Sequence, residues 1–161
     1  MEDVVREADT AKGTFYLSFP TWDDLLEAIR GRIVVAFDAA HPLQIEACTQ
    51  ADWPQLLEWL AVAFVDAIVG MGGLHVVLWH TDFVQRWPMP PASNPINRLT
   101  AVIRAGQEAG AFARIDAALA GRLLFAVIHE TADALVGGED RECALAAMNW
   151  ILRRALEQEA R

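Results

Sequence analysis

The sequence predicts an all-α protein, and three observations carry that prediction. Alanine and leucine are its most frequent residues. Apolar residues recur at helical spacing along almost the whole chain, and runs of β-branched residues are short. The 161 residues are enough to bury a core without support from disulfides or structural metals. We therefore expect helices that pack on one another.

Capping residues and helix breakers define the expected elements in chain order. Two short helices flank a tight turn at Asp9 and Thr10. Thr21 is well placed to cap a long third helix, which the His41-Pro42 pair ends. The expected helices span residues 1–8, 11–17, 21–40, 52–70, 74–86, 96–109, 116–136 and 140–158, with a proline-rich loop at 87–95.

Two further signals support the later helices. Asp52 precedes a Trp-Pro pair, which is typical of a helix start with proline in the first turn. Gly110 and the Gly137-Gly138 pair are typical of helix ends. The last two helices should therefore form a hairpin.

Charge and cysteine usage exclude several classes of protein. The net charge is −9 and Lys12 is the only lysine, which disfavours a general nucleic-acid coat or a binder of anionic membranes. Any contact with DNA must therefore be confined to a small part of the protein surface. Cys48 and Cys143 lie far apart without Cys-x-x-Cys spacing, which argues against a disulfide framework and a zinc ribbon. We expect a cytoplasmic protein.

One apolar stretch approaches the length of a membrane span. It runs from Trp59 to Trp79, and Gly70, Gly72 and Gly73 split it into two pieces. Acidic residues within and beside it would be costly in lipid. We therefore expect no membrane span, and the acidic N-terminus without an apolar run predicts no signal peptide.

Residues 4–29, VVREADTAKGTFYLSFPTWDDLLEAI, contain a Gly-Thr-Phe-Tyr-x-x-Phe signature that leads into the long third helix. This segment resembles the DNA-binding region of the TetR family of transcriptional regulators. Residues 103–113, IRAGQEAGAFA, are similar to the family's ligand-domain helix before its final hairpin. The resemblance implies a partial helix-turn-helix at residues 1–28 and a ligand-binding and dimerisation domain at residues 29–161.

The second short helix holds the residues expected to read double-stranded DNA. A helix-turn-helix needs small or polar residues on the outer face of this helix and apolar residues such as Phe15 and Phe19 on its inner face. The resemblance implies contacts to bases or nearby phosphates from Lys12 and Thr14, and a phosphate contact from the Tyr16 hydroxyl. The expected DNA contacts are Lys12, Gly13, Thr14, Tyr16 and Thr21.

Three departures from the family pattern predict weak binding to an operator. The family's longer helix before Val4 has no counterpart here, so we expect an incomplete reading domain that exposes Val5, Phe15 and Phe19. Asp9 replaces the usual turn glycine, and Trp22 replaces the usual lysine. Residues 1–40 also hold four basic and eight acidic side chains.

Aromatic side chains concentrate in the middle of the chain and predict a pocket for a small hydrophobic or aromatic effector. We expect the pocket between the helices at 52–70, 74–86 and 116–136. Core packing is the alternative explanation for each aromatic residue. His80 and Asp82 are further candidate polar anchors. The expected ligand-binding residues are Trp59, Phe64, His75, Trp79, Phe83, His129 and Asp133, with the His75 and Trp79 pair ranked highest because they share one helix face.

Residues 129–133, HETAD, invite comparison with the His-Glu-x-x-His motif of zinc proteases. Asp133 replaces the second histidine, and the sequence offers no evident third ligand. We therefore expect a buried His129 hydrogen-bonded to Asp133, with no metal, no cofactor and no enzymatic activity.

The last two helices are apolar over a wider arc than one neighbour can cover, which predicts a second burial partner. A homodimer through a four-helix bundle supplies it, with Leu123, Val127, Leu145, Met148 and Leu152 at the interface. We expect a ligand-responsive DNA-binding repressor. The alternative is a helical dimeric ligand-binding protein that has lost DNA binding and forms mixed dimers with full-length relatives.

Overall fold

The computed structural model describes residues 2–49, 52–79 and 94–158, and every regular element among them is helical, as predicted. Their ends agree with the predicted ones within about two residues. Part of the predicted helix at 74–86 and most of the proline-rich loop lie outside the described residues, as do His80, Asp82 and Phe83. The elements are α1 (Glu2–Glu7), α2 (Lys12–Ser18), α3 (Trp22–Ala40), the 3-10 turn η1 (Ile45–Ala47), α4 (Trp53–Met71), α5 (Gly73–Trp79), α6 (Pro95–Glu108), α7 (Ala117–Val136) and α8 (Arg141–Leu156).

Side-chain caps begin most of the long helices. Thr21 and Asp24 form a reciprocal capping box at the start of α3, in which each side chain accepts a hydrogen bond from the other residue's backbone N–H. Asp52 precedes α4 as predicted, but its carboxylate accepts hydrogen bonds from the hydroxyl and N–H of Thr49, at 2.6 and 2.7 Å. These bonds lower the pKa of Asp52. The caps of α6, α7 and α8 are Asn94, Asp116 and Asp140.

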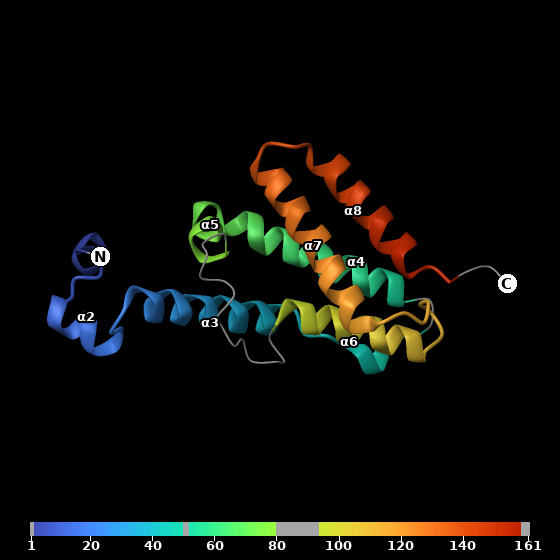
Figure 1. Ribbon diagram of the computed structural model, residues 1–161, viewed down its shortest axis with the longest axis horizontal. Helices are drawn as coiled ribbons and strands as arrows, with labels where there is room; N and C mark the ends of the chain where they lie inside the picture. The colour runs from blue at the N-terminus through green and yellow to red at the C-terminus, as the bar shows by residue number, and fades with distance from the viewer. Residues whose placement is uncertain (1, 50–51, 80–93, 159–161) are drawn as a thin grey trace.

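The core is built around α4. This helix packs against α6, α7 and α8, and Leu60, Ala61 and Val65 on it are completely buried. Figure 1 shows α7 crossing α4 and α6, with α8 returning beside α7. By length and composition alone, α4 is also apolar enough to cross a membrane. In this fold its apolar surface serves as the centre of a helical core.

The helices α6 and α7 pack closely at Gly121. A Cβ atom there would lie 2.4 Å from the Thr100 hydroxyl oxygen and 3.1 Å from the Ile96 carbonyl oxygen. Real Cβ atoms do not tolerate the first of these distances. A side chain at this position would therefore push the two helices apart.

The α1–α2 pair lies at the end of α3 that is remote from α7 and α8 (Figure 1). Asp9 occupies the left-handed conformation expected of the turn, with φ 45°. The N–H groups of Asp9 and Thr10 close the end of α1 on the carbonyls of Arg6 and Val5. The expectation that Phe15 is exposed is wrong, because this residue is only 6% exposed.

Burial divides the predicted dimer residues into two groups. Met148 and Leu152 are 1% and 0% exposed, so they belong to the core of the single chain, where α8 packs against α7 and α4. Leu152 therefore cannot form the predicted interface with a second chain, whereas Met148 still lines the groove between α7 and α8. Leu145 and Val127 are half-buried beside this core, and Leu123 is exposed on α7.

Gly121→Ala should lower the free energy of unfolding by about 1–3 kcal/mol, because the added methyl group overpacks the contact between α6 and α7. Gly70→Ala in α4 is the matched control, since no atom lies within 4 Å of its Cβ position. The control should keep its stability or gain up to about 1 kcal/mol from helix propensity. Urea denaturation measures both values, and equal stability of the two variants would contradict the close helix contact.

Candidate functional site

An apolar cavity of about 70 Å³ lies where α3, α4, α5 and α7 meet. Almost all of its wall is apolar. The wall comes from α3 (Ile33, Val34, Phe37), α4 (Phe64, Ala67, Ile68, Met71), α5 (His75, Trp79), the start of α6 (Pro95) and α7 (Phe125, His129).

Aromatic rings from three helices form a continuous row along the cavity. Phe37 stacks on Phe64 with the ring centroids 4.6 Å apart, and Phe64 meets Phe125 edge-on at 6.0 Å. Phe125 is followed by His129 at 6.1 Å. Such a row favours flat or hydrophobic ligands, because the ring faces and edges offer large apolar contacts at fixed angles.

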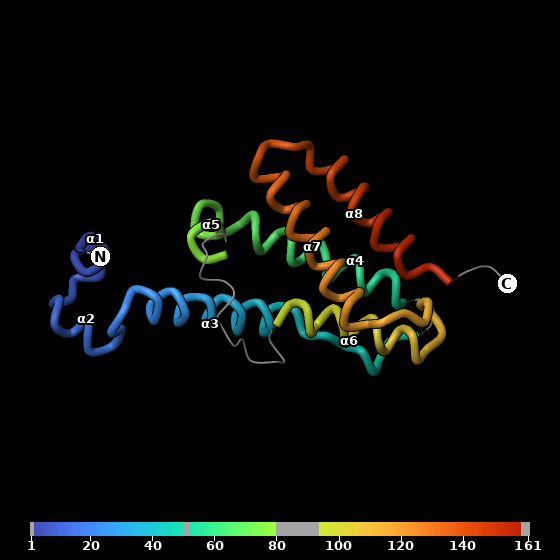
Figure 2. The backbone as a smooth tube through the Cα atoms, in the orientation of Figure 1, coloured from blue at the N-terminus to red at the C-terminus, as the bar shows by residue number. Residues whose placement is uncertain are grey.

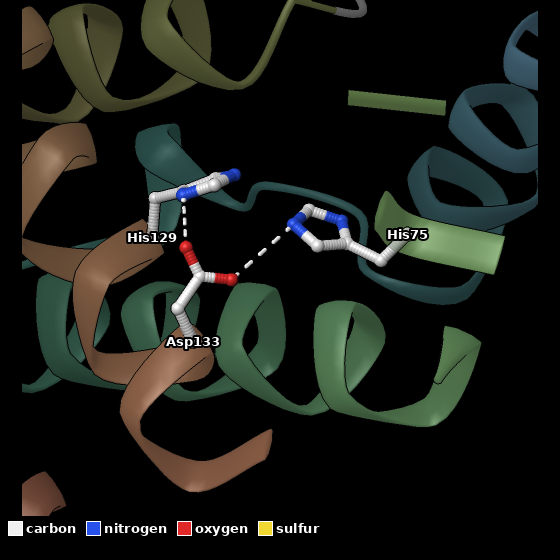
Figure 3. A group of neighbouring side chains, drawn as sticks. All are labelled: His75, His129 and Asp133. Atoms are coloured by element: carbon white, nitrogen blue, oxygen red, sulfur yellow. Dashed lines mark ion pairs between the residues drawn. The ribbon is translucent and has the colours of Figure 1, made fainter. Parts of the chain in front are cut away.

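The row ends in a polar group formed by α5 and α7. His75 stacks on Trp79 at 5.5 Å between centroids and lies 4.8 Å from the His129 ring. Asp133 stands between the two imidazoles, with its carboxylate oxygens 3.7 Å from His75 Nε2 and 3.1 Å from His129 Nδ1. Figure 3 shows the three side chains pointing toward one another. The cavity therefore has one polar end.

This geometry corrects the expectation that no third ligand lies near His129 and Asp133. His75 reaches them from α5, and the ligand atoms of the three residues lie within 4.8 Å of one another. His129 is a quarter exposed at its side chain rather than buried. The sequence predicted all three residues at one pocket, but it did not show that His75 reaches the other two, because α5 and α7 are distant in the chain.

The structure brings most of the predicted ligand residues to the cavity. Phe64, His75, Trp79 and His129 line it. Trp59 does not, because it is 43% exposed. Positions 59 and 64 are five residues apart on α4, which turns their side chains about 140° from each other around the helix axis.

The contribution of α3 to the cavity was missed at the sequence level. Ile33, Val34 and Phe37 share one face of that helix at spacings of three and four residues, which signals a buried stripe but not its partner. The same helix carries α1 and α2 at its other end, and Figure 2 traces it as a nearly straight rod. One element thus joins both ends of the molecule.

Two buried arginines hold the cavity helices against α3. Arg30 on α3 donates a hydrogen bond from Nε to the Leu78 carbonyl in the last turn of α5, at 2.8 Å. Burial lowers the pKa of the Arg30 guanidinium, which stays charged because its ordinary pKa is so high. Arg98 on α6 donates to the Asp38 carboxylate and to the His41 carbonyl. These contacts fix α5 and α6 relative to α3.

The predicted DNA contacts lie on the exposed side of α2. Lys12, Gly13, Thr14 and Tyr16 are all exposed, and the Lys12 ammonium lies 3.4 Å from a Glu2 carboxylate oxygen. A Cβ atom at Gly13 would meet nothing within 4 Å. The remaining predicted contact, Thr21, uses its hydroxyl in the capping box of α3.

No family model, curated protein or solved structure matches this chain. The cavity and the arrangement of α1, α2 and α3 are the features of the molecule that bear on its function.

A small apolar aromatic compound should bind in the cavity beside Trp79. Bromobenzene tests this directly, because its heavy atom quenches the fluorescence of a tryptophan that it contacts. We expect saturable quenching of the protein, which Trp79→Phe should largely remove. Trp59→Phe is the control, since Trp59 does not line the cavity. Quenching that rises linearly without saturation, or that falls equally in both variants, would show that the cavity does not take the compound.

Proposed function

We propose that this chain is a ligand-responsive DNA-binding transcriptional repressor of the TetR family, with a small hydrophobic or aromatic effector. The observation that carries the proposal is the position of α3. Only three residues separate its start from the end of α2, and its C-terminal half supplies Ile33, Val34 and Phe37 to the cavity wall. A helix of 19 residues spans about 28 Å, so it can transmit a change at the cavity to α1 and α2.

The outer face of α2 supports the DNA-reading part of the proposal. Gly13 is the second residue of α2, in the first helical turn, where glycine is less favourable than alanine. Nothing within the described residues requires it, because its Cβ position is open. Close approach of the helix backbone to a DNA groove would account for it. The signature at residues 13–19 points to the same use of this helix.

The effector would act by binding to α3 and α5 at the same time. A ligand in the cavity contacts Phe37 on α3 and His75 and Trp79 on α5. The buried bond from Arg30 to Leu78 joins the same two helices. A ligand that prefers one spacing of α3 and α5 therefore biases the direction of α3, which is the differential interaction that allosteric coupling requires.

A dimer is part of this proposal, because two recognition helices are needed to read two half-sites of an operator. An apolar groove runs between α7 and α8, and its walls include Leu123, Val127, Ala147 and Ile151. Leu123 and Ile151 are exposed in the single chain. A second copy packed on this groove would form the four-helix bundle and cover them.

The second candidate is a helical dimeric ligand-binding protein that does not read DNA and pairs with related DNA-binding chains. The excess of acidic side chains near the N-terminus favours this second candidate. Residues 1–40 carry four basic and eight acidic side chains, and Lys12 lies beside Glu2. Phosphates would meet little positive charge at this end of the molecule.

DNA binding should be weak, because residues 1–40 are acidic overall, but under the proposed function it should still favour the sequence flanking the gene of this protein. A titration of that DNA against a shuffled duplex measures it, at a stated salt concentration. Gly13→Ala should weaken specific binding about tenfold or more while leaving the fold intact, since the methyl group points only outward. Tyr16→Phe should weaken all sequences alike, and Thr14→Ala should change the preferred sequence. Gly70→Ala is the control. Equal affinity for both duplexes would favour the second candidate.

The dimer should dissociate when charge is placed in the groove between α7 and α8. Light scattering at tens of micromolar should give a dimer for the wild type and a monomer for the double variant Leu123→Arg, Ile151→Arg, since two buried guanidinium groups would lack partners. Val35→Arg is the control at an exposed apolar position on α3. A monomeric wild type would contradict the proposed interface.

A further inference from the structure

We propose that His75, His129 and Asp133 bind one divalent transition-metal ion at the polar end of the cavity, and that the ion keeps an open coordination position facing the apolar wall. This site goes beyond the repressor function, because metal binding by these residues does not depend on whether the chain reads DNA.

The donor geometry is close to that of a three-ligand metal site. The ligand atoms of the three residues lie within 4.8 Å of one another. An ion at the centre of such a triangle would be at most about 2.8 Å from each donor, compared with about 2.0–2.2 Å in zinc sites with histidine and carboxylate ligands. Each donor would therefore move inward by at most about 0.8 Å to reach these zinc distances, which small side-chain rotations achieve.

The helices hold these donors on one side of the site. His129 and Asp133 are four residues apart on α7, so their side chains leave the same face of the helix. His75 comes from α5 with its side chain only 3% exposed. Stacking on Trp79 orients its ring, and the Arg30 bond to Leu78 fixes α5. The donor set is thus largely preorganised.

Two imidazoles and one carboxylate select a particular class of ion. Imidazole nitrogen suits ions from iron(II) to zinc(II), whereas calcium and magnesium prefer oxygen ligands throughout. Three protein ligands leave at least one coordination position for water or a ligand atom. The side chains of His129 and Asp133 are 25% and 31% exposed, which gives the ion a path of entry from solvent.

The open position indicates the chemical class of the ligand. His75 and His129 line the cavity, so a molecule inside it can reach an ion that they hold. The rest of the wall is apolar and aromatic. The site would therefore take a small aromatic or aliphatic molecule with one metal-binding end, such as a carboxylate, a hydroxamate or a thiolate.

The test uses the full chain after treatment with EDTA and removal of the chelator, with no DNA present. Calorimetry with Zn²⁺ should give one site per chain, and Co²⁺ should develop visible absorption bands typical of nitrogen and oxygen coordination below six ligands. Saturating Zn²⁺ should raise the melting temperature, because the ion binds the folded chain. Mg²⁺ should neither bind to this site nor raise the melting temperature.

Variants separate this site from adventitious binding. His129→Gln and Asp133→Asn change partly exposed positions and should fold, and each should lower Zn²⁺ affinity about 100-fold or more. His75→Phe keeps an aromatic ring beside Trp79 and should have the same effect. Glu130→Gln, which removes an exposed charge from the neighbouring position on α7, should bind as the wild type does.

Two results would overturn the metal site. One is the absence of Zn²⁺ binding at about 100 µM free ion, where a three-ligand site should be filled. The other is equal binding by the wild type, His129→Gln and Asp133→Asn. Benzohydroxamate should then shift the Co²⁺ bands of the wild type, and unchanged bands would overturn the open position. Failure of these tests would not change the result of the DNA titration. The metal site and the repressor function can therefore be contradicted independently of each other.

Discussion

The buried hydrogen bond from the Arg30 guanidinium to the Leu78 carbonyl is the contact on which the architecture of the site depends. It closes the last turn of α5 against α3, which places His75 and Trp79 opposite the α3 wall of the cavity. A charged group is costly to bury unless its donors are used, so this contact is a strong constraint on the spacing of the two helices. Since α3 also carries α1 and α2, the same constraint relates the cavity to the N-terminal end.

Helix ends were predictable because they depend on short-range chemistry. Thr21 begins α3 through a capping box that its own sequence neighbours complete. Asp52 shows the limit of such reasoning, because Thr49 competes successfully for its carboxylate. Burial was harder to predict. Met148 and Leu152 were assigned to a dimer surface, but an apolar stripe does not reveal whether its partner belongs to the same chain.

The candidate site was predictable in pieces. The spacing of four residues correctly grouped His129 with Asp133 and His75 with Trp79, because each pair lies on one helix. The meeting of the two pairs depends on the packing of α5 against α7, which no local pattern encodes. For the same reason the third donor beside His129 was missed, and the α3 wall at Phe37 was not foreseen.

Under the proposed function, occupancy of the cavity is transmitted along α3 to α1 and α2. Hydrogen exchange of the wild type with and without saturating bromobenzene tests it most directly, because it reports both ends of α3 at once. We expect changed exchange at the cavity helices and also in Lys12–Ser18, which does not line the cavity. A change confined to the cavity helices would contradict it.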